Sequence, residues 1–135
     1  MAGSPFYARI KADVLAIVAS IPEAKVCTFS SIGQYLDVVP RHIAYILSTL
    51  EPLEKVMFPW YRVVGNEGSL GKPKISETGE TQAQLLSHEG ILVSNNSIAA
   101  VFANCFIPCG NLKSGVKKQT RPADAPISKV KKRKI

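Results

Sequence analysis

Residues 30–50 read SSIGQYLDVVPRHIAYILSTL, and the rest of the fold can be built around them. Ser30 or Ser31 can cap a helix that runs through Leu36, because a serine hydroxyl accepts a hydrogen bond from a free backbone N–H. Pro40 suits the first position of a second helix, where an N–H would have no partner. Two short helices joined by a few residues predict a helix-turn-helix unit.

The second helix has one apolar face, and we expect Pro52 to mark its end. The residues of this face are Ile43, Ile46, Leu47 and Leu50. Residues 6–21 show the same helical periodicity and are followed by Pro22, which predicts an opening helix. Residues 25–29 alternate and are β-branched, so we expect a short extended segment between the helices.

The second half of the chain alternates between turns and short periodic segments. Residues 59–71 begin extended and turn at their glycines, and residues 78–88 predict a helix with Gly90 at its C-terminal end. Residues 91–93 suggest a strand, and residues 98–106 suit a last helix or strand. The expected fold class is α+β: a small winged helix-turn-helix domain.

The chain has 135 residues, of which 46% are hydrophobic, and this suits one domain, placed at residues 5–108. The longest apolar candidate, residues 91–108, is interrupted by polar residues, so no stretch approaches the roughly 20 residues of a membrane span. The N-terminus has no basic and apolar secretory signal. We expect a soluble intracellular protein with no membrane partner and, without a dimerisation signal, a monomer.

Positive charge is concentrated at the C-terminal end. Residues 1–110 hold eight Lys or Arg against nine Asp or Glu, whereas residues 111–135 hold nine against one, so the whole chain is +7. Residues 109–135 therefore predict a disordered basic tail. The run KVKKRK at Lys129–Lys134 is typical of nuclear import, and also of an electrostatic arm that raises DNA affinity by counterion release.

Three cysteines, Cys27, Cys105 and Cys109, are an odd number and make a disulfide framework improbable. His42 and His88 stand alone, without the paired ligands that zinc requires. We expect no metal site and no cofactor, and we interpret the cysteines as buried thiols.

Residues 58–64 read FPWYRVV. This segment resembles the Pro-Cys-His-Arg-Val signature of the O6-alkylguanine-DNA alkyltransferases, and resembles more closely their alkyltransferase-like relatives, in which the cysteine is often tryptophan. The resemblance spans residues 6–95. An opening helix, the two-helix unit, the Pro-Trp-x-Arg-Val segment, a glycine loop and Gln82-x2-Leu-Leu-x2-Glu89-Gly90 follow in the family's order.

The resemblance implies that the protein binds double-stranded DNA and rotates an O6-alkylguanine out of the duplex, because the lesion cannot be reached in the stack. In the family, the second helix of the two-helix unit enters the minor groove. Arg41 occupies the position of the arginine that fills the vacated space, and the small Ala44 would let this helix approach the DNA backbone. Phe29 stands where a tyrosine normally helps to rotate the target phosphate.

In the same comparison, Trp60 holds the position of the acceptor cysteine, Tyr61 that of the activating histidine, and Glu89 that of the glutamate. An indole cannot accept an alkyl group by displacement, so the resemblance implies no enzymatic activity. It implies recognition of the lesion, which is then marked for nucleotide excision repair proteins.

The remaining pocket residues implied by the resemblance are Arg62, Val63, Lys72 and Lys74. Arg62 is as suited to tying the pocket segment down as to touching DNA, and for Glu89 a structural role is favoured. The two lysines are solvated loop residues by default, with phosphate contact as the alternative. Tyr61 either stacks near the base or fills the space of the histidine.

Two other functions stay open on the sequence. One is a winged-helix DNA-binding module that has no preference for a lesion, because the tyrosine and the histidine of the family are both replaced. The other, more remote, is an active alkyltransferase that uses Cys27, Cys105 or Cys109 in place of the missing acceptor.

Overall fold

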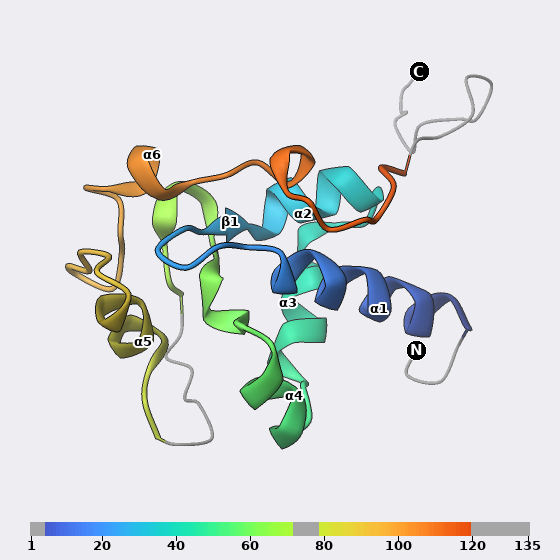
Figure 1. The fold of residues 1–135 in the computed structure, drawn as a ribbon, viewed down its shortest axis with the longest axis horizontal. Coiled ribbons are helices and arrows are strands. Elements are labelled where there is room, and N and C mark those ends of the chain that lie inside the picture. The colour runs from blue at the N-terminus through green and yellow to red at the C-terminus, as the bar shows by residue number, and fades with distance from the viewer. Residues whose placement is uncertain (1–4, 72–78, 120–135) are drawn as a thin grey trace.

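The computed structural model describes residues 5–71 and 79–119. It forms a mainly helical domain with a small central sheet (Figure 1). In chain order the helices and strands are α1 (Pro5–Ala19), β1 (Cys27–Thr28), α2 (Phe29–Leu36), α3 (Pro40–Ser48), α4 (Pro52–Met57), β2 (Val63–Val64), α5 (Gln82–His88) and α6 (Phe102–Cys105). Single 3-10 turns follow at Trp60–Arg62, Asn66–Gly68 and Cys109–Asn111.

The sheet joins two segments that are far apart in sequence. β1 and β2 pair in parallel, with Cys27 opposite Val63 and Thr28 opposite Val64. All four side chains are buried, as expected of a parallel pair covered on both faces. Because β1 leads directly into α2 and β2 follows the Trp60–Arg62 turn, the pairing fixes the helix-turn-helix relative to that turn.

The helix-turn-helix unit is confirmed, with α2 and α3 in close contact. A Cβ on Gly33 would lie 2.4 Å from the carbonyl oxygen of Val38, so only glycine permits this approach. Asp37 ends α2 in a left-handed conformation, with φ at 58°. The predicted serine cap is wrong: Thr28 caps α2, its hydroxyl accepting from the Ser31 N–H at 3.0 Å.

Pro52 does not end the second helix as predicted. α3 ends at Ser48, and Pro52 begins α4, where the absence of an N–H is again harmless at a first helical position. Glu51 and Glu54 form a reciprocal capping box at this start. The same rule that placed Pro40 correctly therefore also applied to Pro52.

The helix before the C-terminal region starts later than predicted and is followed by loops. α5 begins at Gln82 because Thr81 caps it, with Gln84 completing a capping box. Gly90 ends it with φ at 90°, as expected. The predicted strand at residues 91–93 is wrong: the pairing lies further on, in single bridges that join Ser97 to Ser69 and to Ser94.

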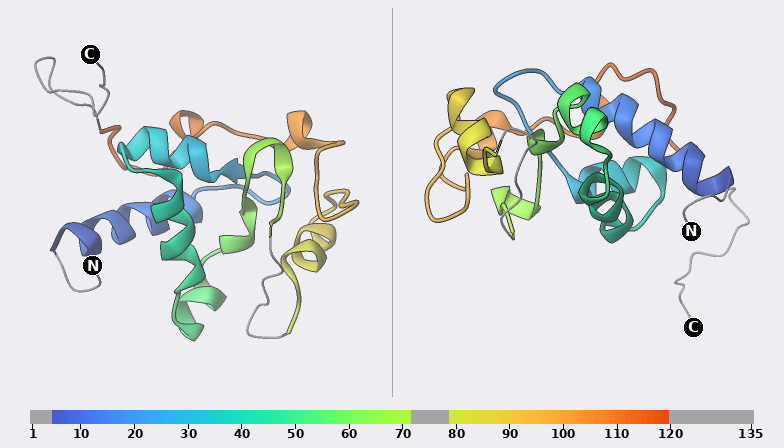
Figure 2. Two further views of the ribbon diagram at one scale, coloured as in Figure 1. Left: turned by 180° about the vertical axis from the view of Figure 1, so that it is seen from behind. Right: turned by 90° about the horizontal axis from the view of Figure 1, so that it is seen from below.

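Two hydrophobic clusters lie on either side of the sheet. The larger one gathers α1, α2, α3 and the Trp60–Arg62 turn, and includes Ile10, Val14, Ile17, Ile32, Ile43 and Leu47. The smaller one packs α5 against residues 91–105 and includes Val26, Val64, Leu70, Leu86, Ile91 and Ile98. Both views in Figure 2 place α5 at the end of the molecule opposite the start of α1. The predicted α+β fold class is confirmed.

The described part of the chain continues past the predicted domain boundary at residue 108. Cys109 is buried, and Leu112 and Val116 pack against the larger cluster. Residues 109–119, which the sequence analysis assigns to the basic tail, therefore have three apolar side chains packed on α2 and the core. Residues 120–135, with the basic run Lys129–Lys134, lie outside the described residues. Among the described helices, none has the length and apolar character needed to cross a bilayer.

Candidate nucleic-acid interface

α3 has a buried face and an exposed face. Ile43, Ile46 and Leu47 point into the core, whereas Arg41 and Tyr45, one helical turn apart, are exposed. Tyr45 is 49% exposed, which is unusual for a large aromatic side chain in a small domain. The periodicity that marked the buried residues also marks this opposite face, yet the only residues of this helix expected from the sequence to contact DNA were Arg41 and Ala44.

A hollow of about 310 Å³ lies beside the start of α3. It is lined by the facing parts of α2, the connecting turn and the first residue of α3: Ser30, Gly33, Gln34, Asp37, Val38, Val39 and Pro40. The absence of a side chain at Gly33 is part of what leaves it open. Arg41 follows directly after this hollow, on the exposed side of α3.

The two other residues expected to face DNA from this unit are less exposed than Arg41. Ala44 is half-buried on α3, with a side chain too small to hold the helix away from a partner. Phe29 is the first residue of α2 and packs partly against the larger hydrophobic cluster. Its ring therefore helps to seat α2 on the core.

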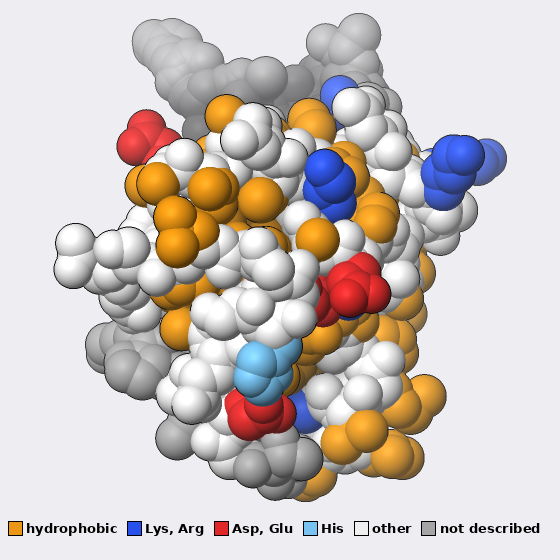
Figure 3. Space-filling view, turned by 60° about the vertical axis from the view of Figure 1, so that its left-hand side comes forward, with side chains coloured by type: hydrophobic (Ala, Val, Ile, Leu, Met, Phe, Trp, Pro, Cys, Tyr) orange, Lys and Arg blue, Asp and Glu red, His pale blue; other side chains and the backbone are white. Residues whose placement is uncertain are grey.

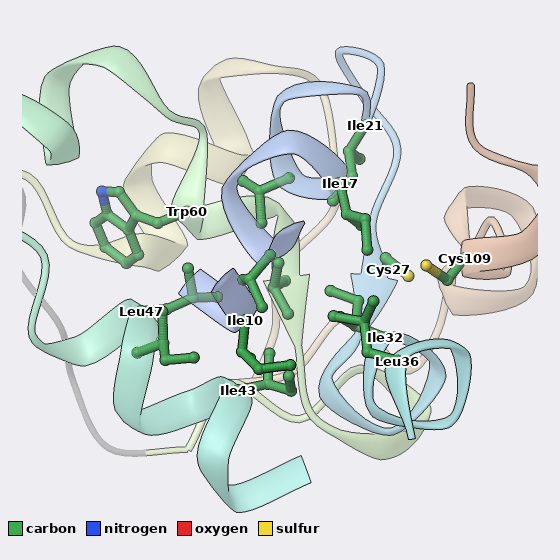
Figure 4. Close-up of a cluster of buried hydrophobic side chains, with 14 of the residues drawn as sticks. Ile10, Ile17, Ile21, Cys27, Ile32, Leu36, Ile43, Leu47, Trp60 and Cys109 are labelled. Carbon is green, nitrogen blue, oxygen red and sulfur yellow. The ribbon is translucent and has the colours of Figure 1, made fainter. Parts of the chain in front are cut away.

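Trp60 sits in a tight turn that directs its side chain inward. The Trp60 N–H donates to the Phe58 carbonyl at 2.8 Å, and the Arg62 N–H donates to the Pro59 carbonyl at 3.0 Å. The indole is 5% exposed and belongs to the larger cluster (Figure 4). It meets the Tyr61 ring edge-on, with centroids 5.9 Å apart. The tryptophan is thus a fixed wall of this turn.

Arg62 and Glu89 form the principal ion pair of the site. The Arg62 Nε lies 3.0 Å from Oε2 of Glu89, and its Nη1 donates to the Ile21 carbonyl at 2.7 Å. Their side chains are only 15% and 8% exposed. Glu89 also accepts from the Ala24 N–H at 2.9 Å. Of the two roles open for Arg62, the structure shows the structural one: the Arg62 side chain links the segment after α1, the Trp60–Arg62 turn and the end of α5.

Tyr61 takes up the remaining hydrogen-bonding capacity of Glu89. Its hydroxyl donates to Oε2 at 3.0 Å, and its ring lies 5.6 Å from the Arg62 guanidinium carbon. Burial and the hydrogen bond to Glu89 raise the pKa of Tyr61. Tyr61 is therefore a direct partner of the glutamate, at the position that the resemblance gives to the histidine.

Glu89 is held as a carboxylate by its surroundings. Burial acts to raise its pKa, but hydrogen bonds from Arg62, the Ala24 N–H and Tyr61 outweigh burial, and the pKa of Glu89 is lowered. An anionic Glu89 with these three partners acts as a structural anchor, which is the role favoured from the sequence.

Gln82, which sequence reasoning used only as a motif residue, supports the same turn from α5. Its Nε2 donates to the Tyr61 carbonyl at 3.0 Å and to the Val63 carbonyl at 3.1 Å. The residue is 4% exposed, and its Oε1 is buried without a hydrogen-bond partner among the residues that the structure describes. A glutamine at the first position of a helix gives no sequence signal for such a role, because it would ordinarily be solvated.

Of the other expected pocket residues, Val63 lies in β2 with its side chain 1% exposed, so it contributes to the core. Lys72 and Lys74 fall outside the described residues. The structure thus brings together Trp60, Tyr61, Arg62, Val63 and Glu89 in one cluster. Arg41, Ala44 and Phe29 belong to the separate helix-turn-helix unit.

Cys27 and Cys109 lie away from Trp60 (Figure 4). Figure 4 shows the sulfur atoms of Cys27 and Cys109 directed toward one another, with Trp60 in another part of the cluster. Burial raises the pKa of Cys27 despite hydrogen bonds that lower it. Burial and the neighbouring Cys27 raise the pKa of Cys109 to about 12. Both thiols are protonated at neutral pH, which is unfavourable for nucleophilic attack.

Electrostatically, the α5 end of the molecule is mixed. In the view that turns this side forward, charged side chains of both signs are scattered among uncharged and hydrophobic surface (Figure 3). The exposed His88 and the half-buried Glu80 form a pair there, with Nδ1 and Oε2 3.1 Å apart. Across residues 5–71 and 79–119, no group of three or more potential metal ligands comes together.

Comparison with known proteins places this geometry in a family. Residues 9–91 match the family model described as 6-O-methylguanine DNA methyltransferase, DNA binding domain. The chain belongs to this family. The match contains the helix-turn-helix, the Trp60–Arg62 turn and α5 with Glu89, and it ends well before residues 109–119.

Relatives within the family include Alkyltransferase-like protein 1 of Schizosaccharomyces pombe, 30% identical over 83 residues, which are 60% of this chain and 75% of that protein. A crystal structure of S. pombe Atl1 with damaged DNA containing O6-carboxymethylguanine matches with a TM-score of 0.55 and 27% identity, over 64% of this chain and 81% of that one. A second S. pombe ATL structure with DNA matches with a TM-score of 0.52 and 25% identity, over 72% and 89%.

Proposed function

We propose that this protein recognises O6-alkylguanine in double-stranded DNA and does not repair it. The observation that carries the proposal is Trp60: it is a buried indole in the Pro-Trp-Tyr-Arg-Val segment, within the part of the chain that matches the family, where the resemblance expects the acceptor cysteine. The related Atl1 was crystallised with damaged DNA containing O6-carboxymethylguanine. The raised pKa values of Cys27 and Cys109 support the absence of alkyl transfer.

In the proposed complex, α3 contacts DNA through its exposed face. Arg41 enters the space that the rotated guanine leaves, and the base is held near the turn that begins at Trp60. Tyr61 and Arg62 are engaged by Glu89, which supports a rigid pocket wall that exists before DNA binds. A preformed wall lowers the ordering cost of binding.

Two steps of the proposal concern the cell. The bound, distorted DNA would be passed to nucleotide excision repair proteins, and the protein would act in the nucleus through Lys129–Lys134. Alkylation sensitivity of a deletion of this gene, alone and combined with loss of excision repair, tests the first step. An additive effect would refute it. A fluorescent fusion with and without the basic run tests the second, and equal nuclear signal would refute it.

The central experiment measures binding of the purified protein to matched duplexes with guanine or O6-methylguanine at one stated salt concentration. Arg41→Ala and Trp60→Phe are compared with Arg9→Ala, an exposed arginine on α1. We expect a preference for the lesion that both site variants reduce and the control keeps. Equal affinity for both duplexes would refute lesion recognition and favour a general winged-helix DNA-binding module.

A further inference from the structure

The segment of residues 109–119, here called the C-terminal strap, is fastened to the first helix of the helix-turn-helix. The Cys109 N–H donates to the Ser31 hydroxyl at 2.8 Å. Further along, the Tyr35 hydroxyl donates to the Val116 carbonyl at 2.6 Å, and the Gln119 N–H donates to the Tyr35 carbonyl at 2.8 Å. The strap is thus held at both ends by α2.

Burial alternates along the strap. Leu112, Ser114 and Val116 are half-buried, whereas Lys113, Gly115 and Lys117 between them are exposed, and exposure continues at Lys118. An alternating pattern means that neighbouring side chains point to opposite sides. The apolar side holds the strap on the core, and the lysines extend into solvent.

These lysines differ from Lys11 and Arg62, whose charged groups face carboxylates. Lys11 pairs with Glu54 at 3.1 Å, and Arg62 pairs with Glu89. Within the part of the chain that the structure describes, Lys113, Lys117 and Lys118 have no ion-pair partner, and the strap contains no Asp or Glu. Three unpaired positive charges in one short segment favour an anionic partner.

The strap ends at Tyr35 of α2, the helix that leads into the part of the domain expected to meet DNA. Tyr35 lies two residues before the turn that begins at Asp37, and Arg41 follows on α3. In helix-turn-helix proteins the first helix crosses the DNA backbone while the second enters a groove. A basic segment fixed to the first helix is therefore well placed to meet phosphates that flank the groove.

From these observations we propose that the C-terminal strap is a second DNA contact, in which Lys113, Lys117 and Lys118 bind backbone phosphates next to the site contacted by α3. The contact rests on the proposed function in that it requires DNA on the α3 side. It is independent of the lesion, because phosphates carry no sequence or damage information. It also lies outside residues 9–91, the part that matches the family.

The test compares two charge-matched variants of the full chain, Lys117→Gln/Lys118→Gln and Lys25→Gln/Lys55→Gln. The control removes the same charge from the loop before β1 and from α4. Each lost phosphate contact lowers the slope of log affinity against log salt by about 0.9, so the strap variant loses about 1.8. If the variant and the wild type bind equally at about 1 M salt, this difference in slope corresponds to roughly thirtyfold weaker binding of the variant near 0.15 M salt. An equal loss in the control variant would overturn the proposal.

A third variant, Tyr35→Phe/Val116→Ser, loosens the strap and keeps every lysine. Faster amide exchange at Gln119 reports the release. We expect weaker binding of both duplexes, because lysines in a released segment lose conformational entropy when they contact DNA. Release without any loss of affinity would refute a docked contact. Binding of an acidic polypeptide, poly-glutamate, is measured with the same variants. If poly-glutamate binding depends on these lysines and DNA binding does not, the proposal is also refuted.

The strap and lesion recognition are measured separately in the same experiment. The strap variants change affinity for guanine and O6-methylguanine duplexes by one common factor. If the wild-type protein binds both duplexes equally, lesion recognition fails while the strap result stands. If the strap variants match wild-type binding and salt slope, the strap proposal fails while the lesion preference is unaffected.

Discussion

Glu89→Gln is the substitution whose cost follows most directly from the structure. The carboxylate accepts from the Ala24 N–H at 2.9 Å, from the Tyr61 hydroxyl at 3.0 Å and from Arg62. Glutamine has nearly the same shape, but it carries no charge and its amide NH₂ cannot accept from these donors. Arg62 would then be left with the Ile21 carbonyl and a neutral partner.

Removing one partner of a buried ion pair costs about 3–5 kcal/mol. Glutamine keeps one acceptor oxygen, and the Arg62 side chain is 15% exposed to water, so both features reduce the loss. We expect the free energy of unfolding to fall by about 2–3 kcal/mol. For a domain of this size, that lowers Tm by roughly 10–20 °C.

Urea unfolding at pH 7 measures this change, with the fluorescence of Trp60, the single tryptophan, as the signal. A pH series adds a second reading. Because the pKa of Glu89 is lowered in the folded protein, its stabilisation is complete above its ordinary pKa near 4.5 and is lost as pH falls through the lower folded value. The wild type and variant should therefore converge in acid.

Glu67→Gln is the control, since Glu67 is exposed in a surface turn. A loss below about 0.5 kcal/mol for Glu89→Gln, similar to an ordinary surface substitution, would refute the reasoning. So would a difference from wild type that stays constant down to low pH, because the stabilisation would then not come from the carboxylate.

Two further predictions concern the helix crossing and the thiols. Gly33→Ala should destabilise the domain by about 1–3 kcal/mol, because its Cβ would lie 2.4 Å from the Val38 oxygen. In Gly110→Ala the new Cβ would lie 4.0 Å from the nearest Tyr35 atom, so its free energy of unfolding should stay close to that of the wild type in the same urea titration. Equal stability of the two variants would contradict the close approach of Gly33 to Val38. Cys27 and Cys109 should react slowly with a thiol reagent at pH 8 until denaturant is added, because burial raises both pKa values. Rapid labelling of Cys27 or Cys109 in the folded chain would contradict this prediction. Transfer of a labelled alkyl group from O6-methylguanine DNA to a cysteine would show that the protein is an active alkyltransferase.

Local rules succeeded where the deciding interaction lies within a few residues. The apolar periodicity of α1 and α3, Pro40 at a helix start and Gly90 at a helix end were all predicted from the sequence. The same rules failed where two readings are locally equivalent. Pro52 suits both the end of one helix and the start of the next, and it begins α4 together with the Glu51–Glu54 capping box.

The candidate site divides in the same way. The order of residues around Trp60 was enough to place the chain in its family and to predict that the acceptor thiol is absent. Whether Tyr61 would stack on a base or replace the histidine was undecided. What the structure adds is a contact with Glu89, a residue far along the chain that the fold brings to 3.0 Å from the tyrosine hydroxyl.

By itself the sequence determined the helix-turn-helix and the α+β class, and it predicts a tryptophan at the acceptor position, because hydrophobic periodicity, capping and motif order act over short distances along the chain. Tertiary structure alone decided the Tyr61–Glu89–Arg62 anchor, the support from Gln82 and the docking of residues 109–119 on α2. Composition marked that last segment as too polar to fold. Cys109 is nevertheless buried, and Leu112 and Val116 are half-buried, because α2 and the core supply the surface that the segment lacks on its own.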